Sequence, residues 1–202
     1  MTKLEQLINQ VNKSKNNKSK YKKGSLINTN NASYSYMLSE SNGRNIDNRL
    51  KDAISPNNML RAGIFEGKYL NDDAIEFPKK WYIDALKANK LSPDERNVSM
   101  NKFKIKSGLP LSKWKEKGWL YGHDKKGWFQ WWCRYYIGRR LTTNDDNIDV
   151  DEIQIKRWVA YKRHWSQLKK NIDKEEQHNN EQFRAKQRQS LLQWGWEQPD
   201  KI

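Results

Sequence analysis

The sequence has little of several residue types that define common classes of protein. A single cysteine, Cys133, excludes an intrachain disulfide and argues against a cysteine-based metal site. Apolar residues make up only 35% of the chain, and no apolar run approaches the roughly 18 residues that a membrane-spanning helix needs. The first residues also lack the apolar segment of a signal peptide. We therefore expect no membrane partner and an intracellular location, in the cytoplasm or the nucleus.

Motifs that identify common enzymes are also missing. The chain has no GxxxxGKS/T phosphate loop, no GxGxxG turn, no HExxH and no CxxC. Cys133 lies among aromatic residues, as a plain buried thiol would. Acid–base chemistry would need a carboxylate with a shifted pKa, for which Asp72, Asp73 and Glu76 are the candidates. We predict no cofactor, name no catalytic residue, and leave open whether the chain is an enzyme.

The acidic residues between Asp145 and Glu152 are possible metal ligands, but their spacing does not match that of a calcium-binding loop. Acidic residues in the first turn of a helix complement the helix dipole and cap its free N–H groups. We therefore predict a capped helix start at this place and no metal site.

The chain is strongly basic, with a formal net charge of +15. Its 28 lysines accompany 21 asparagines, a bias typical of AT-rich coding sequence, so arginine is the more informative basic residue. Seven of the 11 arginines lie between positions 134 and 188. Arginine is the planar donor that binds phosphates and carboxylates in pairs of hydrogen bonds. The excess positive charge as a whole is spread along the chain, which favours a polyanionic partner in general.

The stretch 127–140 concentrates aromatic residues and predicts a helix that is apolar almost all the way round, as a central buried helix is. One strip differs, because Gln130, Arg134 and Gly138 are spaced four apart and share a face. A buried guanidinium needs partners. The sequence leaves open whether Arg134 meets a structural carboxylate or a bound nucleic acid.

The periodicity of apolar residues predicts a mainly α-helical fold: a compact helical domain around the aromatic helix, with room for one short hairpin. Residues 1–45 read as a flexible, disordered Lys/Asn-rich arm with a short helix at 2–12, residues 46–196 as the domain, and 197–202 as a tail. Further helices are expected over 46–54, 58–63, 78–91, 110–119, 152–172 and 182–194. Alternating residues around Phe103 and Ile105 suggest a short strand.

Basic residues fall on several of these helices. Lys156, Arg163 and Lys170 repeat every seven residues and form a ridge, which is either a solvated face or a surface that follows phosphates. Arginines beside tryptophans and tyrosines also suit nucleic acid, because bases stack on aromatic rings. The candidate nucleic-acid-binding residues are Gln130, Arg134, Arg139, Arg140, Lys156, Arg157, Arg163, Arg184 and Arg188.

Three blocks of the chain carry a resemblance: the loop 59–72, the stretch 127–140 with Gln154 to Trp158, and the ending 184–194. Over residues 56–196 they resemble an uncharacterised Trp/Arg-rich family found in large DNA viruses and scattered eukaryotes. That resemblance implies a domain boundary but no activity, and it adds the virion to the expected locations.

Three functions remain open at this point. The chain is expected to bind nucleic acid, DNA or RNA, through phosphate contacts and aromatic stacking. It could instead be a nucleic-acid-processing enzyme with a pocket near Gln130 and Arg134. The third hypothesis is a structural or packaging protein of a large DNA virus. The sequence leaves the oligomeric state undetermined.

Overall fold

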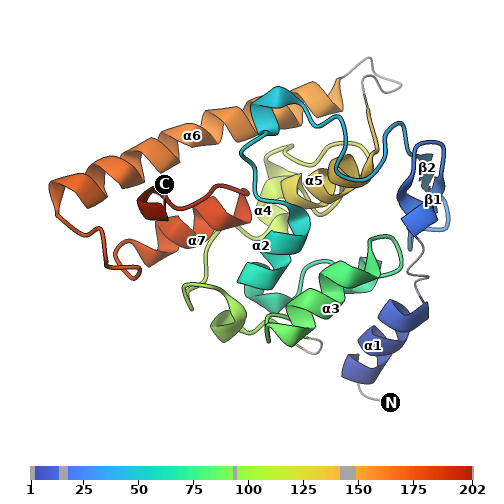
Figure 1. Cartoon of the computed structure of the whole chain (residues 1–202), viewed down its shortest axis with the longest axis horizontal. Helices are drawn as coiled ribbons and strands as arrows, with labels where there is room; N and C mark the ends of the chain where they lie inside the picture. Colours follow the sequence, from blue (N-terminus) through green and yellow to red (C-terminus); the bar gives the residue numbers. More distant parts are fainter. Residues whose placement is uncertain (1–2, 14–17, 93–94, 142–148, 202) are drawn as a thin grey trace.

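A computed structural model describes residues 3–13, 18–92, 95–141 and 149–201. Within these ranges the protein is mainly helical, as predicted, with a single two-stranded antiparallel sheet. Figure 1 shows α6 along one edge of the molecule, α7 beside it, and α1 at the opposite edge. The helices are α1 (Lys3–Lys13), α2 (Pro56–Ala62), α3 (Lys79–Lys87), α4 (Leu111–Glu116), α5 (Trp128–Ile137), α6 (Val150–Lys174) and α7 (Ala185–Gln193).

Helix α5 is the centre of the core and confirms the predicted buried aromatic helix. Every residue of it except Tyr136 is buried. Its indole N–H groups all have acceptors: Trp128 donates to the Gln154 carbonyl and Trp131 to Asp151, at 3.2 and 2.7 Å. The helix ends at Gly138, where φ is +118° and a Cβ atom would lie 2.0 Å from the carbonyl oxygen of Glu40. Only glycine fits there.

Helix α6 begins with the predicted cap. The side chain of Asp149 accepts a hydrogen bond from the backbone N–H of Glu152 at 2.8 Å. Asp151 is buried and accepts from the Leu141 N–H, so it joins the helix start to the end of the preceding segment. The other acidic positions of this stretch, 145 and 146, lie outside the described residues.

The N-terminal segment differs from the expected disordered arm. Strands β1 (Leu26–Asn28) and β2 (Ser35–Met37) pair with Ile27 opposite Tyr36, and both of these side chains are buried in the main core. Helix α1, which was predicted, packs against α3. A few well-placed apolar residues are enough to fold this hairpin, because the large aromatic core supplies the surface that they cover.

Two further predictions of secondary structure were wrong. Residues around Phe103 and Ile105 form bends rather than a strand, and Phe103 is fixed by its N–H, which donates to Gln189 at 3.2 Å. The expected helix over 46–54 is reduced to one 3-10 turn, Asn48–Leu50. Among the described residues, no helix is long and apolar enough to cross a membrane.

Candidate nucleic-acid interface

Arg134 has structural partners. Its guanidinium meets Glu76 at 2.6 and 3.0 Å, Asp124 at 2.9 Å and the His123 carbonyl at 2.8 Å. Burial alone would lower its pKa, but hydrogen bonding and attraction to Glu76 outweigh this and hold the pKa above its usual value. The side chain is 3% exposed. Of the two partners that the sequence allowed, the structure contains the carboxylate.

The side chain of Gln130 also has hydrogen-bond partners within the fold. Its side-chain amide donates to Asp73 at 3.3 Å, and its oxygen accepts from the Lys126 N–H at 2.9 Å. Neither Gln130 nor Arg134 is among the lining residues of the three main cavities in the described part of the chain. Glu76 is fully buried in its ion pair, so it is not free for acid–base chemistry.

Three more of the predicted arginines also hold the fold together. Arg139 is buried and donates to Asp124 at 2.6 Å. Arg188 is buried against Asp200 at 2.9 Å. Among the described residues, Arg140 donates to the backbone carbonyls of Tyr135, Arg139, Arg44 and Asn45. Arg139 and Arg188 are therefore enclosed in the fold, and Arg140 is held against the backbone.

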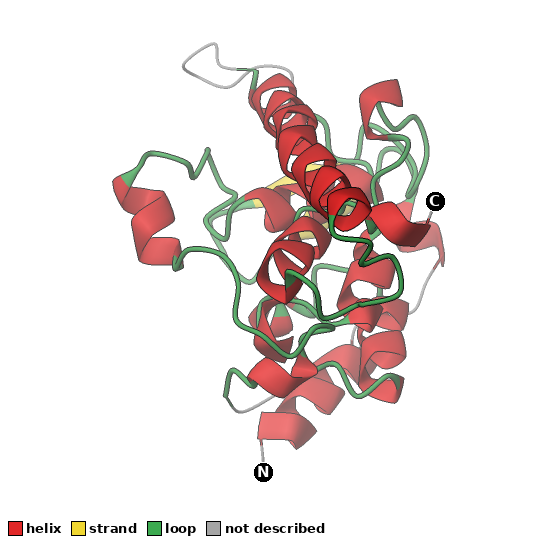
Figure 2. Ribbon diagram, turned by 90° about the vertical axis from the view of Figure 1, so that its left-hand side faces the viewer, coloured by secondary structure: helices red, strands yellow, loops and turns green. Residues whose placement is uncertain are grey.

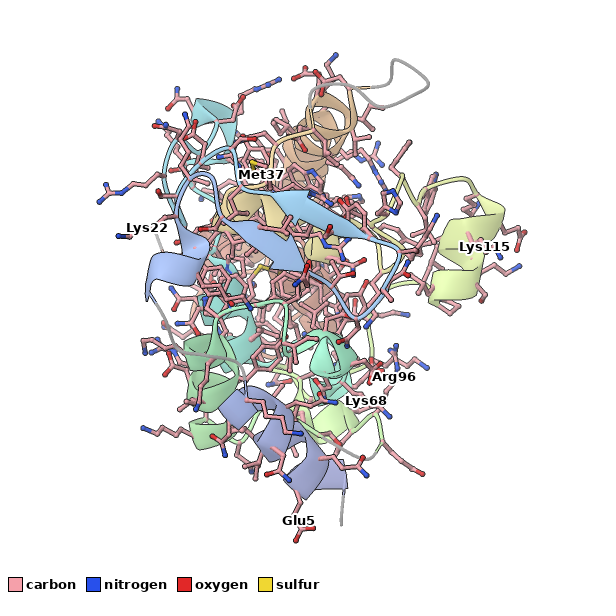
Figure 3. The ribbon with its side chains drawn as sticks, turned by 90° about the vertical axis from the view of Figure 1, so that its right-hand side faces the viewer. Glu5, Lys22, Met37, Lys68, Arg96 and Lys115 are labelled. Atoms are coloured by element: carbon pink, nitrogen blue, oxygen red, sulfur yellow. The ribbon has the colours of Figure 1, made fainter. Side chains whose placement is uncertain are left out.

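Three of the four remaining candidates, Arg157, Arg163 and Arg184, lie around a groove, which we call the basic groove. It has a cavity volume of about 1150 Å³ and lies between α6, the start of α7 and the segment 105–119 that carries α4. Figures 2 and 3 show this segment standing away from the body of the molecule, with Lys115 on α4 labelled in Figure 3. The groove is lined by Ile105, Ser107, Gly108, Leu109, Trp114, Trp119, Arg157, Ala160, Tyr161, Arg163, His164, Gln182, Arg184, Ala185, Lys186, Gln187, Ser190 and Trp194.

Charge is the distinctive property of this lining. It contains three predicted arginines, Arg157, Arg163 and Arg184, together with Lys186, and it includes neither Asp nor Glu. Arg184 also forms an ion pair with Glu175, with Nη2 3.5 Å from Oε1. Among the described residues, no carboxylate lies within ion-pair distance of Arg163 or Lys186, both of which are exposed. The groove therefore presents positive charge that the protein itself leaves unneutralised.

Helical periodicity explains how the groove is built. Arg157, Tyr161 and His164 are spaced four and three apart, so they share one face of α6. The Tyr161 hydroxyl is hydrogen-bonded to the Ser190 hydroxyl of α7, and the Gln187 side chain donates to the His164 carbonyl at 3.0 Å. These contacts fix the two helices beside each other.

Arg157 lies at the inner wall among aromatic rings. Its guanidinium carbon is 5.2 Å from the ring centre of Trp114 and 5.6 Å from that of Trp194, within the range of cation–π attraction. It donates to the Trp119 carbonyl at 3.0 Å. Burial lowers the pKa of Arg157, because no carboxylate compensates for the lost hydration. A ligand phosphate at this wall would supply the missing negative charge.

Of the predicted ridge of Lys156, Arg163 and Lys170, only Arg163 is among the lining residues of the basic groove. Lys156 is 72% exposed, pairs with Glu152 at 3.3 Å, and lies outside the basic groove. Sequence reasoning missed Lys186 as a site residue and missed the aromatic wall formed by Trp114, Tyr161 and Trp194. Their spacing in the chain gave no signal, since the three rings come together only through the packing of α4, α6 and α7.

Comparison with protein-family models, with curated proteins and with solved structures finds no match for this chain. The site is therefore defined by its geometry.

Proposed function

We propose that this protein binds nucleic acid, DNA or RNA, in the basic groove. One observation carries the proposal: a cavity of about 1150 Å³ is lined by three arginines, a lysine and several aromatic rings, with no carboxylate among the lining residues. A groove that served only as a solvated surface would not need to be free of acids in a chain that contains 24 of them.

The two kinds of side chain have separate tasks. Arg163 and Lys186 lie exposed at the rim, where they neutralise phosphates and release counterions. The aromatic rings of Trp119 and Tyr161 are partly exposed, and a base stacked on such a ring contributes about 1–3 kcal/mol. A polyanion without bases could use only Arg163 and Lys186. The partly exposed rings of Trp119 and Tyr161 therefore favour nucleic acid over other polyanions.

Salt-resolved binding tests the proposal. The affinities for single-stranded DNA, double-stranded DNA and RNA are measured by fluorescence anisotropy over a series of salt concentrations. We expect the logarithm of the affinity to fall linearly with the logarithm of the salt concentration. Absence of binding to all three at roughly 50 mM salt would refute the proposal. Including magnesium in the same samples reveals any strand cleavage.

The two alternative functions stand differently. Gln130 and Arg134 are buried and line none of the three cavities, which counts against a processing enzyme with its pocket beside them. A packaging role would use the same basic surface. Size-exclusion chromatography with and without nucleic acid distinguishes packaging from discrete binding. Packaging predicts large assemblies, whereas a discrete binder predicts a small stoichiometric complex.

A further inference from the structure

A second, smaller cavity adjoins the basic groove. It has a volume of about 360 Å³, which falls in the range of small-molecule sites. The two cavities share the loop 107–109 and the residues Trp114, Ser190 and Trp194. The two cavities therefore adjoin along this shared wall, and a molecule held in the groove lies next to the second cavity, which we call the aromatic pocket.

Six aromatic side chains contribute to its walls. Phe65 and Tyr69 are stacked with ring centres 4.1 Å apart, and Phe129 lies 5.6 Å from Phe65. On the side shared with the groove, Trp114 and Trp194 are stacked at 5.8 Å. Walls of this kind suit a planar aromatic ligand, which can lie parallel to one ring and edge-on to another.

Polar and charged side chains also line the pocket: Glu66, Arg96, Lys106, Ser107, Ser190 and Gln193. Gln193 and Glu66 are the most deeply buried of them. Gln193 is 4% exposed, and its Nε2 donor has no hydrogen-bond partner among the described residues. Glu66 is 3% exposed, and one of its carboxylate oxygens lies 3.2 Å from the Arg96 guanidinium at the surface. A buried donor without an acceptor costs free energy that a ligand would recover. Gln193 Nε2 is thus an unused donor in the pocket wall, and Glu66 supplies carboxylate oxygens that it shares with Arg96.

The backbone beside this pocket is strained and firmly held. Phe65 and Glu66 have φ values of +49° and +58°, a left-handed conformation that is unfavourable for both residue types. The Glu66 N–H donates to Asn101 at 2.8 Å, and its carbonyl accepts from the Asn97 N–H at 2.9 Å. Strain that the surroundings enforce in this way is characteristic of ligand sites. Here it places the Glu66 carboxylate in the pocket wall.

We propose that the aromatic pocket receives one unstacked nucleobase of the nucleic acid bound in the basic groove. Gln193 Nε2 donates to a ring nitrogen or carbonyl oxygen of the base, and Glu66 accepts from an N–H group on the same edge. The idea rests on the proposed function and narrows it. Paired bases have these edges occupied, so the preferred substrate is single-stranded or locally open nucleic acid.

Free nucleosides test the pocket without the groove. The four ribonucleosides are measured against the intact protein by saturation-transfer NMR and calorimetry. We expect at least one to bind saturably with a Kd of about 1 mM or tighter, the affinity that a single stacked and hydrogen-bonded base can supply. If none of the four shows saturable binding, the pocket is not a nucleobase site, whether or not the polymer binds.

Variants separate this inference from the proposed function. Gln193→Met removes the unpaired amide at nearly constant volume, so we expect it to fold and to weaken nucleoside binding by about three- to tenfold. Glu66→Gln keeps the shape of the other polar group and is expected to weaken binding similarly. Unchanged nucleoside binding in both overturns the inference.

The Arg163→Ala/Lys186→Ala variant is the matched control: it should lose polymer affinity and keep nucleoside binding. Nucleoside binding without polymer binding in the wild type would reject the proposed function alone.

Discussion

Arg134 of α5 and Glu76 form a two-pronged ion pair inside the core, with Nε–Oε1 and Nη2–Oε2 distances of 2.6 and 3.0 Å. Tyr36 of β2 donates to the same carboxylate at 2.7 Å, and Asp124 holds the other side of the guanidinium. Helix α5, the sheet and the loop before α5 therefore meet at one buried charge network. The polar strip of the aromatic helix joins parts of the fold that are distant in sequence.

We predict that Arg134→Met destabilises the protein by about 3–5 kcal/mol, because it leaves the buried carboxylate of Glu76 without its ion-pair partner. The free energy of unfolding is obtained from urea denaturation. Lys80→Met is the control, since it breaks an exposed pair with Asp84 and should cost no more than about 1 kcal/mol. A loss for Arg134→Met as small as that of the control would show that the buried network contributes little.

Tyr36→Phe tests whether the hairpin belongs to the fold. Burial and then the nearby Glu76 raise the pKa of Tyr36 well above its usual value, so its hydroxyl is a neutral donor at ordinary pH. Removing it leaves Glu76 with one hydrogen bond fewer, and we expect a loss of about 1–3 kcal/mol in urea denaturation. A disordered arm would show no loss. Tyr34→Phe, which removes a hydroxyl contact to Arg139 nearer the surface, should cost less.

The sequence predicted local features better than distant ones. The aromatic helix with its flanking glycines, the helix from Pro78 and the cap at Asp149 follow from periodicity and from residues that start or stop helices. The hairpin was missed because Lys/Asn-rich composition hides the few residues, such as Ile27 and Tyr36, that the core covers.

The candidate site shows the same limit. Arginine content pointed to residues 134–188 but could not show which of these arginines are buried and which face the groove. Arg139 and Arg188 are buried ion-pair residues, whereas Arg163 faces the groove. The positions of Asp124 and Asp200 decide which arginines are buried in ion pairs. Neither carboxylate lies within one helical turn of its arginine in the sequence. Only the tertiary structure brings the carboxylates together with the guanidinium groups.

Cys133 provides a built-in reporter of unfolding. Its thiol is fully buried, and burial followed by the charge of Glu76 raises its pKa well above the usual range. The thiolate is the reactive form, so we expect Ellman's reagent to label the folded protein only as fast as the protein opens. Labelling should accelerate in Arg134→Met by the factor by which the opening equilibrium constant rises, about tenfold for each 1.4 kcal/mol of stability lost. Rapid labelling of the wild type would show that the core near α5 opens locally.

The rim of the groove should set the salt dependence of binding. If Arg163 and Lys186 each neutralise one phosphate, the double variant Arg163→Ala/Lys186→Ala lowers the slope of log affinity against log salt by roughly two. Arg61→Ala/Lys87→Ala removes the same charge from exposed positions on α2 and α3, outside the groove lining, and serves as the matched control. Equal slopes for the two double variants would place the binding surface elsewhere.

His164 should make binding depend on pH. Burial and then the neighbouring Arg163 lower the pKa of this groove residue, so it is neutral in the free protein near pH 7. A bound phosphate favours the protonated imidazole and raises this pKa, and the complex therefore takes up a proton. Affinity must then rise as the pH falls from above the pKa of the complex to the lowered pKa of the free protein. We expect a gain of about three- to tenfold between roughly pH 8 and pH 5.5, measured by anisotropy at constant salt.

Substitution identifies the group responsible. His164→Gln should flatten this pH dependence while leaving the affinity at pH 8 nearly unchanged, because the neutral imidazole contributes no charge there. His123→Gln is the control: the pKa of His123 is also lowered, first by burial, but its ring stacks on Tyr34 and is not part of the groove lining. If both variants keep the full pH dependence, no phosphate lies beside His164. If only His123→Gln abolishes it, the anion binds near the hairpin instead of between α6 and α7.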